Sequence, residues 1–228
     1  MPSAWGAGAF FVGVCGNIGV GKSVFAELLG QRLGWPVYYE PVAENPFLDD
    51  FYRAMNRWAF HLQIYFLAER FKAQKTMVAR RRPFVQDRTI YEDGEIFARV
   101  LRGRGAMDHR DYETFLALFR EMVALLPPPG LLVFLAARPD TLLARIAQRG
   151  RACEASIDAD YLGQLDAAYA EWLPMARRLC PVITIDTDAF TFPPDDTVLG
   201  PLLARIRKAE RERRGRLSAS TKGEQDAV

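Results

Sequence analysis

The chain has 228 residues, a length that suits one α/β domain, and half of its residues are apolar, enough for a sizeable core. The formal net charge of +2 argues against nucleic acid as an obligatory partner. No apolar run reaches membrane-spanning length, and the first residues lack a basic signal-peptide region. The three scattered cysteines have no metal-ligand spacing, so we expect reduced thiols in a cytoplasmic protein with no membrane partner.

The strongest pattern lies near the start of the chain. Residues 10–15 predict a buried strand, residues 24–33 carry apolar side chains at helical spacing, and residues 16–23 fit G-x-x-x-x-G-K-[ST]. Glycines let backbone N–H groups surround a phosphate, and the helix N-terminus adds its positive end. The lysine reaches the β- and γ-phosphates, and the serine hydroxyl is a Mg²⁺ ligand. The loop therefore predicts a nucleoside triphosphate held by Gly16, Asn17, Ile18, Gly19, Val20, Gly21, Lys22 and Ser23.

Acidic residues follow the next two predicted strands. Residues 37–39 read as a short strand that ends at Glu40, because Pro41 stops the ladder. At the carboxyl edge of an open sheet, Glu40 is either a general base for an acceptor hydroxyl or a solvent-facing acid. A third strand from residue 83 ends at Asp87 and Arg88, where Asp87 is a candidate Mg²⁺ ligand and Arg88 a partner for Glu40 or for the transferred phosphoryl group.

The region between these strands predicts a long helix over residues 57–79, preceded by a short helical piece that carries Tyr52. Gln63 and Arg70 are two turns apart and share a face, which suits the edge of a nucleobase; a surface Gln and Arg is the default alternative. Thr89 is expected to begin a helix, which places Asp93 within reach of the same pocket.

The second half of the chain predicts helices over 111–126, 140–148, 160–179 and 197–212, and strands over 131–136 and 181–185. Near a glycine hinge, three arginines form either a lid over phosphates or a solvated basic face: Arg145, Arg149 and Arg151. From Arg205 onward eight Lys/Arg face four Asp/Glu, which favours a solvated helix end over a nucleic-acid site. We expect one domain over residues 1–212 and a polar, disordered tail over 213–228.

These motifs together resemble the deoxyribonucleoside kinases, and among them the bacterial deoxyadenosine/deoxyguanosine kinases. The resemblance covers about residues 11–209 and rests on Gly-Asn-Ile-Gly-Val-Gly-Lys-Ser, Glu-Pro-Val, Asn-Pro-Phe-Leu, the helix of Gln63 and Arg70, Asp-Arg-Thr-Ile-Tyr-Glu-Asp and Arg-Gly-Arg-x-x-Glu. It implies a P-loop kinase three-layer sandwich, in which a five-stranded parallel sheet carries helices on both faces, the first strand lies in the middle and an Arg-rich lid closes the site.

The resemblance implies ATP-dependent phosphorylation of a deoxyribonucleoside 5′-hydroxyl in nucleotide salvage. Glu40 would take the hydroxyl proton, Arg88 would pair with Glu40, and Gln63 would bind the base with an Arg70–Asp93 pair at its far edge.

Other implied roles concern the sugar and the donor. Tyr52 and Asp160 would hold the 3′-hydroxyl, with Asp158 as a competitor for the second role. The three lid arginines would hold the donor phosphates, with Glu154 closing the lid motif, and the loop from Asp186 to Phe190 would contact the donor adenine.

Two features bear on the acceptor. Asp87-Arg88-Thr89 stands where the family often has Glu-Arg-Ser, and we expect the shorter acid still to hold Mg²⁺. A charged pair beside the base suits adenine, guanine or cytosine, whereas the methyl group of thymine favours an apolar pocket. We therefore expect a purine deoxynucleoside, with adenine against guanine undecided and deoxycytidine still open.

Two alternatives remain at this point. A nucleoside monophosphate kinase would need basic residues for the acceptor phosphate, for which Arg53 and Arg57 are candidates, although Glu40 would repel that phosphate. A non-catalytic accessory subunit would be expected to lose Lys22, Glu40 or the lid arginines, which are all present. The resemblance further implies a homodimer through the long helices and feedback inhibition by a deoxynucleoside triphosphate.

Overall fold

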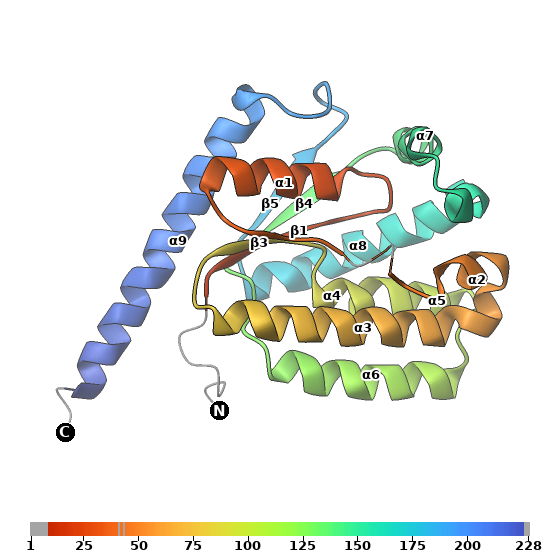
Figure 1. Cartoon of the computed structure of the whole chain (residues 1–228), viewed down its shortest axis with the longest axis horizontal. Helices are drawn as coiled ribbons and strands as arrows, with labels where there is room; N and C mark the ends of the chain where they lie inside the picture. The colour runs from red at the N-terminus through yellow and green to blue at the C-terminus, as the bar shows by residue number, and fades with distance from the viewer. Residues whose placement is uncertain (1–8, 41, 43, 226–228) are drawn as a thin grey trace.

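The computed structural model describes residues 9–225 except 41 and 43, and it is built around one parallel sheet (Figure 1). The strand order is β2-β3-β1-β4-β5, so the strand that leads into the phosphate loop is central, as predicted. All four strand pairs are parallel. The strands are β1 (Phe11–Gly16), β2 (Val37–Tyr38), β3 (Phe84–Asp87), β4 (Leu131–Ala136) and β5 (Val182–Asp186).

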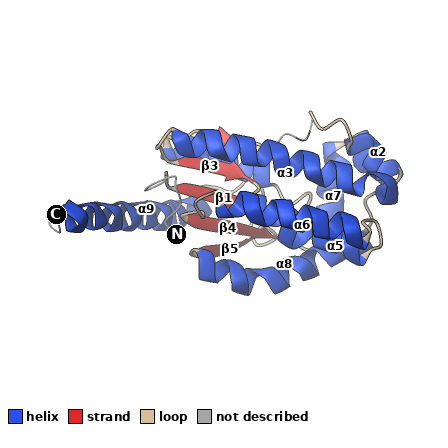
Figure 2. Ribbon diagram, turned by 90° about the horizontal axis from the view of Figure 1, so that it is seen from below, coloured by secondary structure: helices blue, strands red, loops and turns tan. Residues whose placement is uncertain are grey.

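Helices cover both faces of the sheet and confirm the three-layer sandwich (Figures 1 and 2). One face carries α1 (Lys22–Leu33) and α9 (Asp196–Gln225), which contact each other. The other face carries α3 (Met55–Ala79), α4 (Ile90–Glu92), α5 (Arg99–Gly103) and α8 (Ala159–Leu179), with α6 (His109–Ala124) as an outer helix.

Two short helices lie beyond the carboxyl ends of the strands. They are α2 (Leu48–Arg53) and α7 (Pro139–Arg149), and a 3₁₀ turn, Ala152–Ser156, connects α7 to α8. The 3₁₀ turn packs against α2, so the predicted lid meets the start of the predicted acceptor region.

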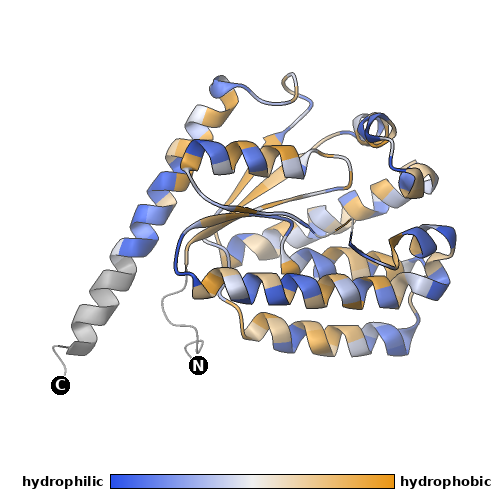
Figure 3. Cartoon of the chain, viewed as in Figure 1, coloured by the Kyte–Doolittle hydropathy of each residue, from blue (hydrophilic) through white to orange (hydrophobic). Residues whose placement is uncertain are grey.

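The core explains why β1 and β4 read as continuous apolar runs. Every residue of β1 is buried, as are the first five of β4, because helices cover both faces of a parallel sheet. The strands are mainly hydrophobic, whereas the outer helices alternate hydrophobic and hydrophilic residues (Figure 3). No described helix is long and apolar enough to cross a membrane.

A helix begins after Thr89 as predicted, but it contains an irregular segment that the sequence does not show. After one turn of α4, residues Asp93–Ala98 form a π-helical segment before α5 begins. Tertiary packing accounts for the distortion: a Cβ on Gly94 would lie 2.7 Å from the Phe119 ring of α6, and Asp93 is buried against Arg70 of α3. Such wide turns occur often at functional sites.

The C-terminal helix is longer than the sequence predicts. Helix α9 continues to Gln225, so residues 213–225 are helical and not a disordered tail; residues 226–228 lie outside the described residues. Beyond Pro201 the helix contains no further proline, and Arg214 pairs with Glu210 one turn earlier at 2.7 Å, a spacing that supports helix. The helix extends past the body of the molecule (Figure 1).

Candidate active site

A cavity of about 670 Å³ opens at the carboxyl edge of the sheet. Its walls come from the loop before α1, the ends of β2 and β3, helices α2 and α3, and the segment from α7 to α8. Most of the predicted site residues line it: Ile18, Gly19, Gly21, Lys22, Ser23, Glu40, Tyr52, Gln63, Asp87, Arg88, Asp93, Arg145, Arg149 and Arg151. The sheet therefore gathers residues that are up to 133 positions apart (Ile18 to Arg151) at one edge.

The phosphate loop has the backbone that its glycines predict. Gly16 has φ +140°, and a Cβ there would lie 2.4 Å from the carbonyl oxygen of Leu135. Lys22 Nζ donates to the carbonyl oxygen of Asn17 at 2.8 Å, which holds the lysine across the loop. Burial, and secondarily the charge of Arg88, lowers the pKa of Lys22 to about 8. An ammonium that is costly to keep charged here gains most from a bound polyphosphate.

A magnesium ion fits beside this loop. Ser23 Oγ donates to Asp87 Oδ2 at 2.5 Å, while Asp87 Oδ1 is buried with no hydrogen-bond partner among the described residues. Burial raises the pKa of Asp87, so a bound cation would favour the charged form of its carboxyl group. The described residues contain no group of three acidic, His or Cys side chains that could hold a metal, so phosphate oxygens and water would complete the coordination.

Glu40 is held between two buried guanidinium groups. Arg88 Nε and Arg70 Nη2 each donate to its carboxylate at 3.0 Å. Burial raises the pKa of Glu40, but the positive charges of Arg88 and Arg70 outweigh it and hold the pKa at about 2. The carboxylate is therefore ionised at neutral pH and oriented before any acceptor arrives.

Arg70 also makes a two-pronged ion pair with the π-helical segment. Its Nε and Nη2 donate to the two oxygens of Asp93 at 2.8 and 3.2 Å. Burial raises the pKa of Asp93 to about 6 even though Arg70 opposes the rise. On the same helix, Gln63 is buried, and its Oε1 has no hydrogen-bond partner in the described part of the chain. The predicted face is thus turned inward and not to solvent: Gln63 lines the cavity, whereas Arg70 is outside the lining and contacts Glu40 and Asp93, which belong to it.

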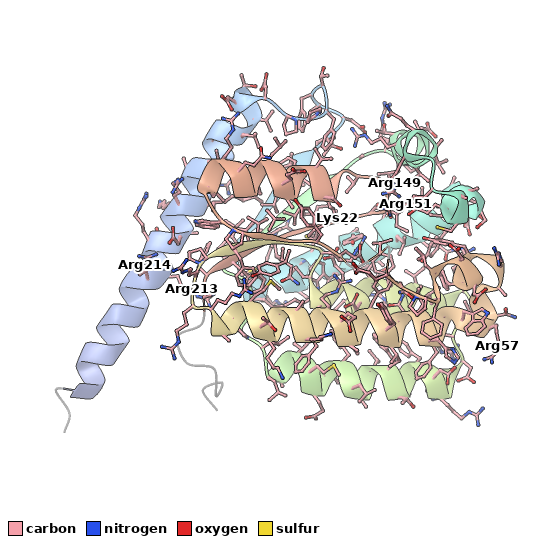
Figure 4. All side chains as sticks on the ribbon, viewed as in Figure 1. Lys22, Arg57, Arg149, Arg151, Arg213 and Arg214 are labelled. Carbon is pink, nitrogen blue, oxygen red and sulfur yellow. The ribbon has the colours of Figure 1, made fainter. Side chains whose placement is uncertain are left out.

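Two of the three predicted lid arginines converge on one buried carboxylate. Both Arg149, from the end of α7, and Arg151 pair with Glu154 in the 3₁₀ turn, the latter at 3.2 Å. In Figure 4 these arginines lie at the connection between α7 and α8, on the side of the molecule opposite to Arg213 and Arg214 of α9.

The sequence profile described as "Deoxynucleoside kinase" matches residues 12–209. The chain belongs to the deoxynucleoside kinase family. Its members are phosphotransferases, so the predicted fold, enzyme class and phosphorylation of a deoxynucleoside to the monophosphate are confirmed.

Individual relatives cover most of the chain. A Bacillus subtilis protein named deoxyadenosine/deoxycytidine kinase is 40% identical over 85% of this chain and 89% of its own length. A deoxyadenosine kinase from Dictyostelium discoideum is 39% identical over 88% of this chain and 79% of its own. The solved structure of deoxyadenosine kinase from M. mycoides with bound dATP is similar with a TM-score of 0.75 and 27% identity, covering 85% of this chain and 98% of that one.

Asp160 does not line the cavity, although the family resemblance implies that it holds the 3′-hydroxyl. Its side chain is 70% exposed and accepts hydrogen bonds from Arg104 and Gln164 outside the cavity. The competitor Asp158 is also accounted for, because its side chain caps α8 by accepting from the backbone N–H of Tyr161 at 2.7 Å. Both acids sit at the outer N-terminal end of a helix, a position that favours acids without any ligand.

Glu154 is the acid of this region that does lie at the cavity. It is 4% exposed, lines the cavity and contributes to raising the pKa of Tyr52, after burial itself and after Tyr161. Tyr161 lines the cavity as well. Sequence analysis had given Glu154 only the role of closing the lid motif and had missed Tyr161, since nothing in their spacing shows that the lid folds back onto α2.

The residues predicted to contact the donor adenine also lie outside the cavity lining. Asp186 and Phe190 do not line the cavity, whereas Phe192 does. A Cβ on Gly21 would lie 2.4 Å from the Phe192 ring, so this ring packs directly on the phosphate loop. Arg145 stacks on the Phe192 ring, with its guanidinium 4.9 Å from the ring centroid. Its guanidinium also donates hydrogen bonds to Val20 and Thr187.

Three residues of the phosphate loop support it from outside the cavity. Gly16 and Val20 are buried in the core, and the amide of Asn17 donates to Leu162 O and to Asp166 Oδ1 of α8 at 2.9 and 2.7 Å. These contacts fix the loop backbone on α8.

Sequence analysis missed one buried acid entirely. Glu92, fully buried, accepts from the backbone N–H of Thr89 at 2.7 Å and forms a capping box with it. The spacing Thr-x-x-Glu was a usable signal for that cap. Its further contacts with the catalytic groups were not visible in the sequence.

Proposed function

We propose that this kinase transfers the γ-phosphoryl group of ATP to the 5′-hydroxyl of deoxyadenosine, with deoxycytidine as a second acceptor. The observation that carries the choice of base is the unpartnered Oε1 of Gln63, deep in the cavity. An acceptor without a donor suits the exocyclic amine that adenine and cytosine share, while the amide N–H group faces the neighbouring ring nitrogen. Two relatives at about 40% identity carry names with deoxyadenosine as substrate.

The Arg70–Asp93 pair closes the far side of the base site. Both side chains are buried and ion-paired, Asp93 with Arg70 and Arg70 with Asp93 and Glu40, so a thymine methyl group would meet a charged and dry surface. We expect thymidine to be a poor acceptor for that reason.

Tyr52 and Glu154 are proposed to hold the 3′-hydroxyl. The two residues come from α2 and from the 3₁₀ turn, and both line the cavity. A ribonucleoside adds a 2′-hydroxyl next to this pair. A 2′,3′-dideoxynucleoside leaves the pair without a partner, so we expect turnover of dideoxyadenosine to fall well below that of deoxyadenosine.

Glu40 is proposed as the acceptor of the 5′-hydroxyl proton. With a pKa of about 2 it is a weak base, so its main contribution before the transition state is to orient the nucleophile. Phosphoryl transfer has a loose transition state that needs little nucleophile deprotonation, which makes such a base sufficient. Arg88 keeps the carboxylate in place and adds positive charge near the transferred group.

The donor site is proposed to comprise the phosphate loop, Lys22 and the lid arginines. Ser23 and Asp87 would hold Mg²⁺, which neutralises charge on the β- and γ-phosphate oxygens when bound. The stacked Arg145 and Phe192 side chains form an edge against which the donor base would rest.

Two further expectations concern the assembly and the setting of the enzyme. We propose a homodimer through α3 and α6, since Leu118 of α6 and Leu125, directly after its last residue, are exposed on a surface that a second copy would cover. A monomer in sedimentation equilibrium at micromolar concentration would contradict it. A cytoplasmic salvage role follows only from the family.

The deciding experiment is an assay of ATP turnover with Mg²⁺ and with deoxyadenosine, deoxycytidine, deoxyguanosine, thymidine and each monophosphate. We expect deoxyadenosine to give the highest kcat/KM, and Glu40→Gln to lower kcat by about 10³-fold. Highest kcat/KM with deoxyguanosine or thymidine would overturn the base assignment.

Turnover with a monophosphate alone would restore the nucleoside monophosphate kinase. The geometry disfavours that enzyme, because Arg53 is exposed and Arg57 stacks on Trp58, and neither lines the cavity. Figure 4 shows Arg57 at the outer end of α3, away from Lys22.

A further inference from the structure

A buried hydrogen-bond junction lies beneath the phosphate loop and outside the cavity. It consists of Glu92 from α4 and Tyr169 from α8, both with no exposed surface. Neither side chain lines the cavity, so neither contacts substrate or donor. Their contacts nevertheless reach both halves of the site.

The first arm of the junction holds the start of the phosphate loop. The backbone N–H of Gly16 donates to Glu92 Oε1 at 3.3 Å, and the Tyr169 hydroxyl lies 2.8 Å from the carbonyl oxygen of the same glycine. Side chains thus bind both the backbone N–H and the backbone carbonyl group of Gly16. Residues other than glycine rarely adopt its φ of +140°.

The second arm holds Arg88. Its Nη1 donates to Glu92 Oε1 at 3.3 Å and to the Tyr169 hydroxyl oxygen at 3.2 Å, while its Nε faces Glu40. Arg88 also has a φ of +66°, unusual for a residue with a side chain, so its backbone conformation is imposed by its surroundings. The guanidinium is bound at both ends, by Glu40 at Nε and by the Glu92–Tyr169 junction at Nη1. These partners together orient both nitrogen atoms, which burial and the charge of Glu92 alone would not do.

A single proton connects the two arms. The Tyr169 hydroxyl lies 2.6 Å from Glu92 Oε1 and 2.8 Å from Gly16 O, and it has one hydrogen to donate to these two oxygens. Any shift of the loop at Gly16 therefore changes the hydrogen bonding of Glu92, and through Glu92 that of Arg88.

We propose that Glu92 and Tyr169 are positioning residues that fix the distance between the phosphate loop and the Arg88–Glu40 pair, and so align the γ-phosphoryl group with the 5′-hydroxyl. The inference rests on the proposed roles of Arg88 and Glu40. In-line transfer depends on this alignment, because misplacement of about 1 Å can lower the rate by about a hundredfold.

The test uses Tyr169→Phe and Glu92→Gln, which keep the shape of the side chains, and the double variant. We expect kcat with saturating ATP and deoxynucleoside to fall about tenfold in each single variant, while the nucleoside KM changes less than threefold. The double variant is expected to lose no more than the poorer single variant, because both substitutions break one unit.

Tyr91→Phe is the matched control. Tyr91 is a buried tyrosine next to Glu92 in the chain, and it lies outside the cavity lining. Its loss of a buried hydroxyl is expected to leave kcat unchanged. The thermal unfolding temperature of each variant is measured as well. A value well above the assay temperature shows that a lower kcat reflects lost alignment and not a loss of folded enzyme.

Three results would overturn the proposal: wild-type kcat in the folded single variants, losses that multiply in the double variant, or an equal loss in Tyr91→Phe. If Tyr169→Phe fails to fold, Glu92→Gln alone decides by its kcat. Absence of turnover in the wild-type chain with every deoxynucleoside would instead overturn the proposed function itself.

Discussion

Two pairs of arginines bind carboxylates that line the same cavity, under different physical conditions. The acceptor-side pair, Arg70 and Arg88, has side chains 3% and 5% exposed, whereas the lid pair, Arg149 and Arg151, has side chains 35% and 43% exposed. Each pair is held by one glutamate, Glu40 or Glu154. The comparison shows how one residue type serves as a fixed part of the site in one place and as an exchangeable one in another.

Burial explains the difference. A buried guanidinium must keep its carboxylate partners, because an unpaired charge in the interior costs several kcal/mol. A half-exposed guanidinium pairs weakly, since water competes for it, and can turn to an incoming phosphate at little cost. We therefore expect the side chains of the acceptor side to have their final geometry before the substrates bind, and those of the lid side to reach it only after binding.

The largest expected effect comes from removing the carboxylate of the acceptor side. Glu40→Gln should lower kcat by about 10³-fold, because the nucleophile loses its proton acceptor and Arg88 loses its partner. Steady-state kinetics with deoxyadenosine measures it. Glu44→Gln, at an exposed acid four residues later, is the matched control and should keep wild-type kcat. Equal activity of both variants would contradict the role of Glu40.

The next effect concerns stability. Asp93→Asn should lower the free energy of unfolding by about 3 kcal/mol at pH 7.5, because it removes a charge partner of the buried Arg70. Urea titration gives the value. Asp50→Asn, at a half-exposed aspartate 3.8 Å from Arg53, should change stability by less than about 0.5 kcal/mol. If both variants lose the same amount, burial is not the cause of the difference.

The lid should show the reverse pattern. Arg149→Ala should lower kcat about 10²-fold through lost stabilisation of the transferring phosphoryl group, yet change the free energy of unfolding by only about 0.5 kcal/mol. The same kinetic and urea measurements apply. A stability loss as large as that of Asp93→Asn would show that the lid arginines are structural.

The smallest effect is a pH dependence of donor use. Since the pKa of Lys22 is lowered to about 8, the free enzyme loses this ammonium as the pH rises through 8, and kcat/KM for ATP should fall about tenfold between pH 7 and 9. Between about pH 8 and 10.5 the unfolded lysine binds more protons than the folded one, so Lys22 should make the unliganded enzyme more stable as the pH rises.

Glu40 provides the internal contrast for this profile. Its pKa of about 2 keeps it ionised across the assay range, so no acid limb above pH 4 should arise from it. A profile for ATP that stays flat up to pH 10 would contradict the assignment of Lys22.

Much of the site could be predicted from the sequence, because the carboxyl ends of parallel strands meet at one edge. Glu40, Asp87 and Arg88 follow strands directly, so their meeting with Lys22 required only the order of elements. Gln63 and Arg70 could be paired because helical spacing puts them on one face. The acid near Tyr52 could not be predicted in this way, since Glu154 lies on the connection between α7 and α8, whose path depends on packing against α2.

The sequence by itself determined the phosphate loop and the parallel sheet, since local glycine geometry and apolar periodicity dictate them. Only the tertiary structure decided the π-helical turn at Asp93, the inward position of Glu154 and the junction of Glu92 and Tyr169. The physical reason is that these features join side chains from separate elements, up to 153 residues apart for Gly16 and Tyr169, and their hydrogen bonds exist only after the elements have packed.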